Sequence, residues 1–253
     1  MKTLNLHFDM DLANKKILVT GASSGIGQAI AIAAATKGAT VLIHYRKNKV
    51  GAHETLAAVK KFSSGAIFQA DLTNENQIQK MFDAIAKQNG AIDALVNNAG
   101  EVVGGDFFNN AAWHEQFENI FFSAVHTTQQ FLQQNRVAKL KKIISVGSIY
   151  GNLGTGNADY FAYSTAKAAL AQMTVTLAQT NPRVLANLIA PGYTLTPLWD
   201  GVSTAIKKSC INKTLIKRFI TPEEVAHVAV ALLENDAITG QVITIDGGRS
   251  PQL

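Results

Sequence analysis

The chain has 253 residues, enough for one large α/β domain and too few for two ordinary domains with a separate substrate module. Apolar residues make up 47% of the chain and charged residues only 16%, which excludes a disordered protein and favours a large buried sheet. The net charge of +5 fits a phosphorylated cofactor or an acidic carrier protein better than nucleic acid, because the basic residues are scattered along the chain.

Short β-branched runs alternate with longer helical patterns from the beginning of the chain to its end. The predicted strands cover residues 16–20, 40–45, 66–70, 92–96, 142–146, 185–189 and 241–245. The predicted helices cover residues 25–37, 52–62, 75–88, 112–134, 161–179 and 222–234. This alternation is typical of an α/β fold in which helices cover both faces of a parallel sheet. We therefore predict one Rossmann-like domain over residues 1–253, a doubly wound parallel sheet of about seven strands.

Residues 193–220 interrupt this alternation between the sixth strand and the last helix. The segment carries large apolar side chains such as Leu198, Trp199 and Phe219. Long insertions near the carboxyl ends of strands either border the substrate or only pack on the surface, and the sequence leaves both interpretations open. The next helix has a clear start at Thr221-Pro222-Glu223-Glu224, with a capping hydroxyl, a proline in the first turn and two carboxylates.

A glycine-rich turn, Thr20-Gly21-Ala22-Ser23-Ser24-Gly25-Ile26-Gly27, follows the first predicted strand and opens an alanine-rich helix. Glycines allow the backbone to approach a pyrophosphate, while helix N–H groups and the helix dipole face its charge. Ser23 and Ser24 add hydroxyl donors. The spacing differs from the better-known Gly-x-Gly-x-x-Gly fingerprint, and a plain strand-to-helix turn is the alternative. The context nevertheless indicates a dinucleotide site.

Tyr163 and Lys167 stand one helical turn apart, and Ser148 lies just past the fifth predicted strand. Each feature alone has an ordinary structural explanation. A tyrosine hydroxyl has a pKa near 10, so bringing it into the neutral range requires about 4 kcal/mol of differential stabilisation. A neighbouring ammonium and a positively charged nicotinamide would supply it. The three residues together therefore predict a proton-transfer site.

With these motifs the chain resembles the short-chain dehydrogenase/reductase family, in its shorter single-domain branch. The glycine-rich turn matches the family's Thr-Gly-x-x-x-Gly-x-Gly. The other matching landmarks are Asp71-Leu72, Asn97-Asn98-Ala99-Gly100, Pro191-Gly192 and Asp246-Gly247-Gly248, each after a predicted strand. The resemblance covers essentially the whole chain. It implies an oxidoreductase that transfers a hydride between a nicotinamide cofactor and a carbonyl or alcohol.

The resemblance also implies roles for four catalytic residues. Tyr163 would be the general acid for carbonyl reduction or the base for alcohol oxidation. Lys167 would lower the pKa of that tyrosine and bind the nicotinamide ribose. Ser148 would hydrogen-bond the substrate oxygen, and Asn119 would hold a water in a proton relay.

The choice of tyrosine needs an argument, because the segment between Ser148 and Tyr163 is longer than is usual in the family. Tyr160 stands nearer the usual distance, but the residue four positions after it is Ser164 and not a lysine. Because residues four apart share a helix face, we select Tyr163. The extra residues lengthen the loop 151–159, which we expect to border the substrate.

The residues expected to bind the cofactor follow from the same resemblance. Asp71 would contact the adenine, and Thr194 and Thr196 the nicotinamide carboxamide. The full set is Gly21, Ser23, Ser24, Gly25, Ile26, Gly27, Tyr45, Arg46, Asp71, Leu72, Asn97, Ala99, Gly100, Tyr163, Lys167, Pro191, Gly192, Thr194 and Thr196.

The end of the second predicted strand indicates which nicotinamide cofactor binds. It reads His44-Tyr45-Arg46-Lys47 and lacks the carboxylate that would accept hydrogen bonds from a ribose 2′-hydroxyl. A guanidinium can fork onto a 2′-phosphate instead, with charge-assisted bonds worth about 1.5–3 kcal/mol. We therefore expect NADPH to be preferred over NADH by tenfold or more. The alternative is that Arg46 is an ordinary solvent-facing residue.

Oligomeric state, metal binding and location can be addressed more briefly. Aromatic residues in 112–134, among them Trp113, Phe117 and Phe121, exceed what one buried stripe needs and predict a partner helix. Relatives in the family pair through this helix, so we expect a homotetramer. The six histidines lack metal-ligand spacing, and we expect no metal. The single Cys210, and the lack of a signal-length or membrane-length apolar run, favour a cytoplasmic protein without membrane partners.

We therefore predict an NADP(H)-dependent reductase of a small carbonyl compound. A 3-oxoacyl chain on a carrier is one candidate substrate, and a polyol, sugar or steroid-like alcohol used with NAD is another. A regulator that binds NADP without catalysis is the alternative from a different class, and it would be expected to lack one of Ser148, Tyr163 and Lys167. A sugar-nucleotide epimerase of the longer branch is disfavoured, because the chain leaves no room for an extra domain.

Overall fold

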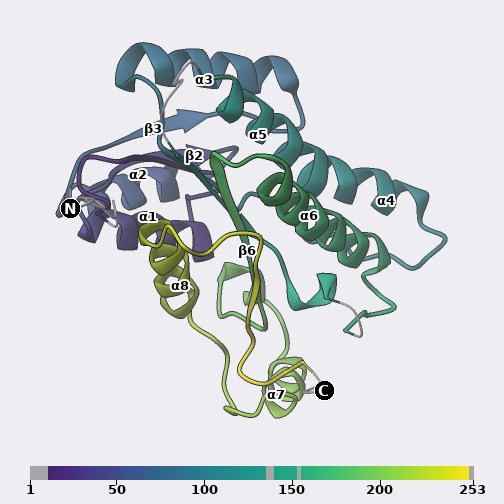
Figure 1. Ribbon diagram of the computed structural model, residues 1–253. Coiled ribbons are helices and arrows are strands. Elements are labelled where there is room, and N and C mark those ends of the chain that lie inside the picture. The colour runs from purple at the N-terminus through teal and green to yellow at the C-terminus, as the bar shows by residue number, and fades with distance from the viewer. Residues whose placement is uncertain (1–10, 135–139, 153–154, 251–253) are drawn as a thin grey trace, which may run out of the picture.

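The computed structural model describes residues 11–134, 140–152 and 155–250. They form one parallel sheet of seven strands in the order β3-β2-β1-β4-β5-β6-β7, with helices on both faces (Figure 1). The strands are β1 (Lys16–Val19), β2 (Thr40–Tyr45), β3 (Gly65–Gln69), β4 (Ala94–Asn97), β5 (Lys141–Val146), β6 (Val184–Pro191) and β7 (Val242–Ile245). The predicted fold class is therefore confirmed. Every predicted strand is present, with ends that differ by one or two residues.

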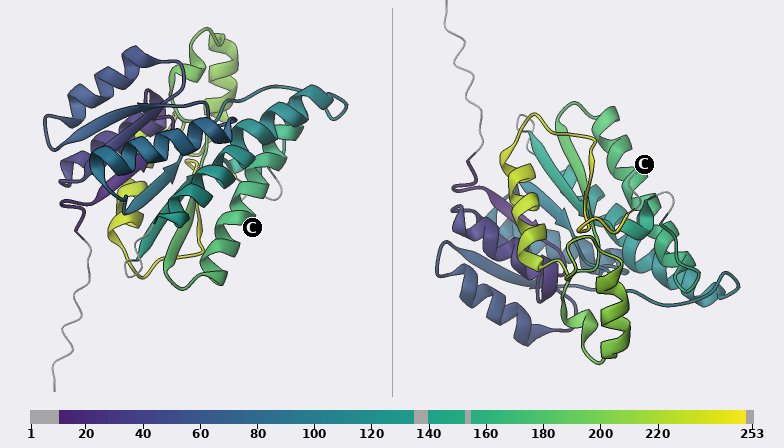
Figure 2. Two further views of the ribbon diagram at one scale, coloured as in Figure 1. Left: turned by 90° about the horizontal axis from the view of Figure 1, so that it is seen from above. Right: turned by 90° about the horizontal axis from the view of Figure 1, so that it is seen from below.

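The helices form two layers, as the views from above and below show (Figure 2). One layer packs on the sheet through α1 (Gly25–Thr36), α2 (Lys49–Val59) and α8 (Pro222–Glu234). The other contains α3 (Glu75–Asn89), α4 (Asn110–Gln116), α5 (Ser123–Gln133) and α6 (Phe161–Thr180). Alternate residues of each strand face opposite layers, so Val19 joins one buried cluster and Leu18 the other. Burial on both faces explains the nearly continuous apolar strands.

The order of the strands places a crevice at one edge of the sheet. The chain builds β1, β2 and β3 outward in one direction, and then returns to place β4 on the other side of β1. Where the order reverses, the loops after β1 and β4 diverge and leave space at the carboxyl ends of the strands. The glycine-rich turn follows β1 at this point.

The predicted helix 112–134 is not one regular helix. Residues Phe117–Phe122 form a π-helical turn, η1, between α4 and α5. The Ser123 hydroxyl donates to the carbonyl of Asn119 at 2.8 Å, which gives that carbonyl a side-chain partner within the turn. A π turn inserts an extra residue into the helix, and such turns concentrate at functional sites. Asn119, the predicted relay residue, lies within it.

Two other helices differ from the sequence-based expectation. Helix α2 begins at Lys49, three residues before the predicted start, because the Asn48 side chain accepts the Gly51 N–H at 3.0 Å and caps it. The insertion 193–220 contains a short 3₁₀ turn, η3 (Pro197–Trp199), and a helix that was not predicted, α7 (Thr204–Asn212). Ser203 caps α7 by accepting the Ile206 N–H at 3.4 Å.

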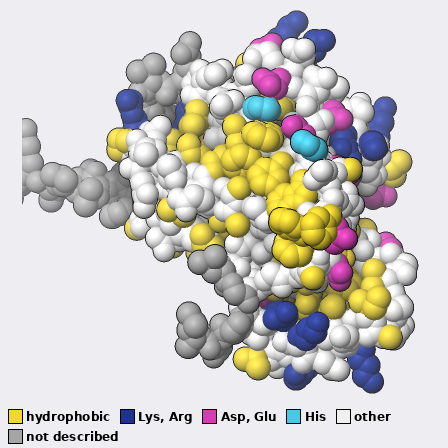
Figure 3. Space-filling view, turned by 90° about the vertical axis from the view of Figure 1, so that its right-hand side faces the viewer, with side chains coloured by type: hydrophobic (Ala, Val, Ile, Leu, Met, Phe, Trp, Pro, Cys, Tyr) yellow, Lys and Arg dark blue, Asp and Glu magenta, His cyan; other side chains and the backbone are white. Residues whose placement is uncertain are grey.

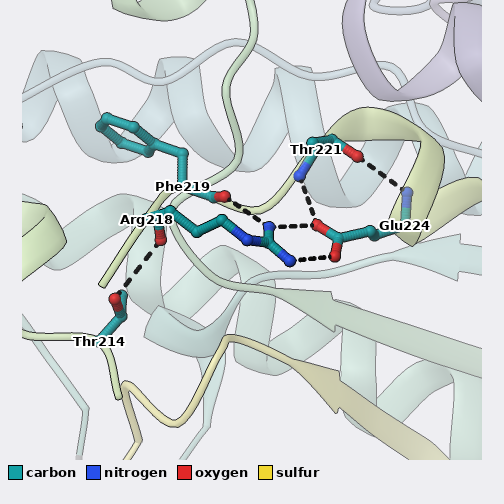
Figure 4. A network of polar contacts seen from close by, with 5 residues as sticks. All are labelled: Thr214, Arg218, Phe219, Thr221 and Glu224. Atoms are coloured by element: carbon teal, nitrogen blue, oxygen red, sulfur yellow. Dashed lines mark hydrogen bonds and ion pairs between the residues drawn. The ribbon is translucent and has the colours of Figure 1, made fainter. Parts of the chain in front are cut away.

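The start of α8 is built as predicted and also anchors the end of the insertion (Figure 4). Thr221 accepts the Glu224 N–H, and the Glu224 carboxylate accepts the Thr221 N–H at 2.8 Å. The Arg218 guanidinium forks onto the same carboxylate at 2.6 and 2.8 Å. The hydrogen bond from Arg218 lowers the pKa of Glu224 to about 2. The carboxylate therefore stays charged through the neutral range.

No helix in the described ranges combines the length and the apolar character needed to cross a lipid bilayer. No cluster of three or more potential metal-ligating His, Cys, Asp or Glu side chains occurs among the described residues either.

Candidate active site

The turn between β1 and α1 depends on its glycines. Gly21 and Gly25 have φ angles of +62° and +56°, in the left-handed region that favours glycine. A Cβ on Gly27 would lie 2.5 Å from the carbonyl oxygen of Gly21, and a Cβ on Gly21 would lie 2.9 Å from the Cα of Ala99. Ser24 precedes the first turn of α1 and makes no capping bond with its side chain. The Ser24 hydroxyl is therefore not used as a cap at the start of α1, where helix N–H groups and the helix dipole favour an anion.

Two neighbouring asparagines on β4 and just after it have different roles. The Asn98 amide donates to the carbonyls of Thr20 and Gly21 at 2.9 and 3.1 Å and thereby holds the turn against β4. The Asn97 amide is buried and donates to the Thr128 hydroxyl on α5 at 2.9 Å. The Asn97 side chain thus faces α5, and its contact with the cofactor stays a prediction. Asn98 was quoted as part of a motif, but its supporting role was not recognised.

His44 supports the turn from the other side. Its Nδ1 accepts the Gly21 N–H at 3.0 Å, and its Nε2 lies 3.1 Å from the carbonyl oxygen of Ala70 after β3. These partners require the neutral ring with its proton on Nε2. Burial lowers the pKa of His44 from 6.5 to about 4 and keeps the ring neutral. A histidine that appeared unremarkable in the sequence therefore joins the turn to the strand that ends at Gln69.

A cavity of about 300 Å³ opens beside the turn, bordered by the loops after β1, β2, β3 and β4 and by η1. Lys47, Asn48, Thr73 and Glu101 contribute to its wall. The predicted site residues that line it are Gly21, Ser23, Ser24, Arg46, Asp71, Leu72, Ala99, Gly100 and Asn119. The other predicted cofactor residues lie outside this wall: Gly25, Ile26, Gly27, Tyr45, Asn97, Tyr163, Lys167, Pro191, Gly192, Thr194 and Thr196.

Arg46 crosses the cavity instead of pointing into solvent. Its Nη1 donates to the Asn119 side-chain oxygen at 3.3 Å, and its Nη2 forms an ion pair with Glu101. Asp71 lies in the same wall. Burial raises the pKa of Asp71, but hydrogen bonds from Thr73 outweigh burial and hold the pKa below its ordinary value. The cavity therefore contains one guanidinium between two carboxylates.

Ser148, Tyr163 and Lys167 converge at the carboxyl end of β5. The Tyr163 hydroxyl is hydrogen-bonded with the Ser148 hydroxyl. The Lys167 ammonium is buried, donates to the Val146 carbonyl at 2.7 Å and lies 5.9 Å from the centre of the Tyr163 ring. Tyr160, the rejected alternative, is the residue before α6, and its ring stacks on Tyr150 at 6.2 Å. The step of four residues thus brings the lysine to Tyr163.

Burial sets the charge states in this group. It raises the pKa of Tyr163 above 10, and the hydrogen bond with Ser148 opposes this effect only in part. It lowers the pKa of Lys167 from 10.5 to about 8. The expected lowering of the tyrosine pKa by the lysine together with a positively charged nicotinamide stays a prediction for the complex. At neutral pH the phenol holds its proton and most of the lysine is charged.

The segment after β6 reaches the glycine-rich turn from the opposite side of the crevice. A Cβ on Gly25 would lie 3.3 Å from the Thr196 methyl group, so Thr196 packs directly against the turn. Thr194 is buried, its hydroxyl donates to the Gly192 carbonyl at 3.1 Å, and its own carbonyl accepts from Trp199 at 2.9 Å. The start of the insertion is therefore attached to the glycine-rich turn, and its role in binding substrate stays a prediction.

A family model described as enoyl-(acyl carrier protein) reductase matches residues 21–250. The chain belongs to the short-chain dehydrogenase/reductase family. One relative is the 3-oxoacyl-[acyl-carrier-protein] reductase FabG of Thermotoga maritima, 32% identical over 94% of this chain and 99% of the relative. Another is the cis-4-hydroxycyclohexanecarboxylate dehydrogenase of Sinomonas cyclohexanicum, 33% identical over 93% of this chain and 96% of the relative. Both alignments span nearly the whole length of each protein.

A solved structure supports the same assignment. The Pseudomonas aeruginosa RhlG/NADP active-site complex superposes with a TM-score of 0.86 at 29% identity, covering 96% of this chain and 99% of that one. Short-chain dehydrogenase/reductases are oxidoreductases, so the assignment explains why a dinucleotide turn and a tyrosine–lysine pair share one sheet edge. The loop 151–159 follows β5 beside this group, and its residues 153 and 154 lie outside the described residues.

Proposed function

We propose that the protein reduces a ketone or aldehyde to an alcohol with NADPH and catalyses the reverse oxidation. The convergence of Ser148, Tyr163 and Lys167 at the sheet edge that carries the glycine-rich turn is the observation that supports this proposal. Burial of the Lys167 ammonium beside a buried tyrosine lowers the stability of the fold. Binding NADP without catalysis would not require this arrangement. We therefore favour catalysis over regulation.

The cofactor site fits a dinucleotide, because its glycines leave no room for a Cβ and its wall combines backbone N–H groups with a guanidinium. Ser23 and Ser24 would contact the pyrophosphate, Asp71 the adenine, and Lys167 the nicotinamide ribose. When bound, NADPH supplies a hydride to the carbonyl carbon and leaves as NADP⁺. Thr196, which packs on the turn, would approach the carboxamide.

The protein's own residues would manage the proton. The Ser148 hydroxyl would orient the carbonyl oxygen, and Tyr163 would donate its proton to that oxygen as the alcohol forms. A raised pKa suits this direction, because the phenol is fully protonated at neutral pH. The Lys167 ammonium would stabilise the phenolate that remains, and Asn119 would hold the water that returns a proton. Reduction is therefore the direction that the charge states favour.

The preference for NADPH rests on Arg46 and Lys47 in the wall of the cavity. Neither β2 nor the four residues after it contain a carboxylate that would repel a 2′-phosphate. Neighbours in structure support the assignment, since one is an NADP complex and the L-sorbose reductase of Gluconobacter frateurii was solved with NADPH and L-sorbose. We propose a preference of tenfold or more.

The names of the relatives suggest two substrate classes. The name of the FabG relative suggests a 3-oxoacyl chain on a carrier protein as substrate. The name of the Sinomonas relative suggests a cyclic alcohol that carries a carboxylate. A polyol or sugar alcohol used with NAD is the alternative that Arg46 disfavours. All of these substrates place a carbonyl or hydroxyl carbon beside the same tyrosine.

We also propose that the protein is a homotetramer in the cytoplasm. A band of hydrophobic side chains crosses the face shown in Figure 3. Its aromatic rings contact one another in series along α4, η1 and the start of α6, and they include the exposed Phe107, Phe108, Phe122 and Phe161. An aromatic surface of this kind is typical of an interface. Light scattering that shows a monomer at micromolar concentration would contradict this assembly.

The test of the proposed function compares two tyrosine variants. Tyr163→Phe removes the proton donor, so NADPH-dependent reduction of a panel of ketones should fall by at least 100-fold while NADPH binding, measured by calorimetry, is retained. Tyr160→Phe removes a hydroxyl three residues away and should keep at least a tenth of the activity. Near-normal turnover by Tyr163→Phe would overturn the assignment.

A further inference from the structure

One cation beside a cluster of tyrosines that includes the candidate proton donor has no role in the chemistry described above. Arg249 follows β7 at the edge of the sheet. It lies beside Tyr193, which follows the neighbouring strand β6, and near Tyr150, which follows the next strand, β5. The Arg249 Nε donates to the Tyr193 hydroxyl at 3.5 Å, and the Tyr193 and Tyr150 hydroxyls are 3.2 Å apart. The Tyr193 hydroxyl therefore links the guanidinium to the Tyr150 hydroxyl through two successive hydrogen bonds.

The position of Arg249 is fixed by packing. Its guanidinium carbon lies 5.9 Å from the centre of the Tyr193 ring, and that ring packs edge-on against Trp199 of the insertion. The turn before it is held by Leu215, whose N–H donates to the Gly247 carbonyl at 2.8 Å. The insertion 193–220 thus contacts the guanidinium through Tyr193 and holds the turn before it through Leu215.

The charge of Arg249 is not used by a direct partner within the described ranges. The nearest carboxylate in sequence, Asp246, accepts the Gly248 N–H at 2.9 Å and the Ser250 N–H at 2.6 Å with its two oxygens. Asp246 therefore acts on the guanidinium only from a distance. Arg249 makes no ion pair among the described residues, and a partly buried arginine with two phenols as neighbours is a suitable receptor for an anion.

The same cluster extends to the candidate proton donor. The Tyr150 ring packs edge-on against the Tyr163 ring, with 6.5 Å between their centres, and it also stacks on Tyr160. Tyr150 thus contacts both the tyrosine that would protonate a carbonyl and the Tyr193 hydroxyl beside Arg249. A substrate with its carbonyl at Tyr163 and its chain along Tyr150 would end at the guanidinium.

We propose that Arg249, with the hydroxyls of Tyr193 and Tyr150, binds a carboxylate of the substrate, so that the protein reduces an oxo acid to a hydroxy acid. This inference rests on the proposed function and adds the substrate class. A carboxylate matches the site better than a phosphate does. One guanidinium neutralises one negative charge, two phenols can donate only single hydrogen bonds, and the cluster contains no second cation.

The test uses matched pairs of acids and neutral esters. The substrates are 4-oxopentanoate, 5-oxohexanoate and 6-oxoheptanoate, each with its methyl ester, and the measurement is kcat/KM for NADPH oxidation. The series of chain lengths finds the span between Tyr163 and Arg249 without assuming it. The wild type should prefer at least one acid over its ester by tenfold or more. Arg249→Gln should lower that acid-to-ester ratio at least tenfold, through KM, and Arg249→Lys should restore part of it.

Arg183→Gln is the control, because it also removes a guanidinium charge. Arg183 lies in the turn before β6, at the amino ends of the strands, whereas Arg249 lies at their carboxyl ends. The control should leave the acid-to-ester ratio unchanged. If the wild type shows no preference for any acid, or if the preference survives Arg249→Gln, the carboxylate site is refuted while the reductase stands. Selective turnover of a neutral 3-oxoacyl N-acetylcysteamine thioester, with all the acids inactive, would refute it as well.

A binding measurement separates this proposal from the proposed function. Hexanoate, which has no carbonyl to reduce, is titrated by calorimetry into the protein saturated with NADP⁺. Binding to the wild type and loss of at least tenfold in affinity in Arg249→Gln support the site. Equal affinities in the two proteins overturn it. If no acid, ester or thioester is reduced by the wild type, the reductase function fails and the hexanoate titration alone decides the fate of the carboxylate site.

Discussion

Lys167→Met should make the protein more stable and inactive at the same time. The ammonium is 6% exposed, and burial lowers its pKa from 10.5 to about 8. This difference corresponds to about 3 kcal/mol of folding free energy lost at pH 7, where the lysine is charged in both the folded and the unfolded state. Methionine fills a similar volume without a charge. It also loses the hydrogen bond to the Val146 carbonyl, which costs about 1 kcal/mol. The net gain should be about 2 kcal/mol.

The pH dependence provides the sharper test of this reasoning. The folded state releases the lysine proton near pH 8, whereas the unfolded state keeps it up to about pH 10.5. Between these values the unfolded state binds more protons, so the stability of the wild type rises with pH. The advantage of Lys167→Met should therefore shrink by about 2 kcal/mol between pH 7 and pH 10.

The assay is urea unfolding of both proteins at pH 7, 8.5 and 10, followed by tryptophan fluorescence, with turnover of a ketone by NADPH measured alongside. Lys16→Met is the matched control, because it removes a lysine from the opposite end of the sheet. The reasoning is refuted if Lys167→Met is less stable than the wild type at pH 7, or if the difference between them does not change with pH.

Two further predictions concern the cofactor end of the crevice. Arg46→Ala should lower kcat/KM for NADPH at least tenfold and change the value for NADH little. Glu101→Gln frees Arg46 from an exposed ion pair worth about 0–1 kcal/mol, so NADPH affinity measured by calorimetry should rise at most about fivefold. Burial lowers the pKa of His44 to about 4. As the pH decreases below 6.5, the unfolded state therefore binds a proton before the folded state does, and the free energy of unfolding decreases. His44→Asn should remove that loss, about 2 kcal/mol at pH 5, and urea unfolding at pH 7 and pH 5 measures it.

The fold could be predicted because its signals are local. Each strand is a short apolar run, and each helix has its own periodicity, so β1 to β7 and their order along the chain follow from patterns within a few residues. A doubly wound parallel sheet was predicted and is confirmed, whereas the spatial order of its strands was not predicted. Helix α7 was missed because its polar, half-exposed sequence has no buried face, so no apolar periodicity marks it.

The candidate site could be predicted in part for the same reason. The glycine-rich turn and the Tyr163–Lys167 step are each a short local motif in the sequence. The structure brings the two motifs to the same edge of the sheet. The π-helical turn at Phe117–Phe122 could not be foreseen, because a residue pattern does not reveal one extra residue in a turn. His44 and Asn98 were missed because their partners lie in the turn after β1, 23 to 78 residues away in the chain.

The charge states show where reasoning from a motif stops. A lysine four residues after a tyrosine, together with a positively charged nicotinamide, predicts a lower pKa for the phenol, but the motif does not reveal how far burial opposes this effect. Burial acts in opposite directions on an acid and a base, since it always opposes the charged form. It therefore raises the pKa of Tyr163 and lowers that of Lys167, and only coordinates show how deep the pair lies.

Arg46 illustrates how one side chain can connect the two ends of a crevice. The sequence indicates a single partner for it, a 2′-phosphate, yet its guanidinium contacts both Glu101 and the relay residue Asn119. Each of its NH₂ groups has two hydrogens, and Nε carries a further one, so the contacts with Glu101 and Asn119 leave three N–H donors for a 2′-phosphate. The guanidinium can therefore bind that phosphate and stay in contact with the proposed relay residue.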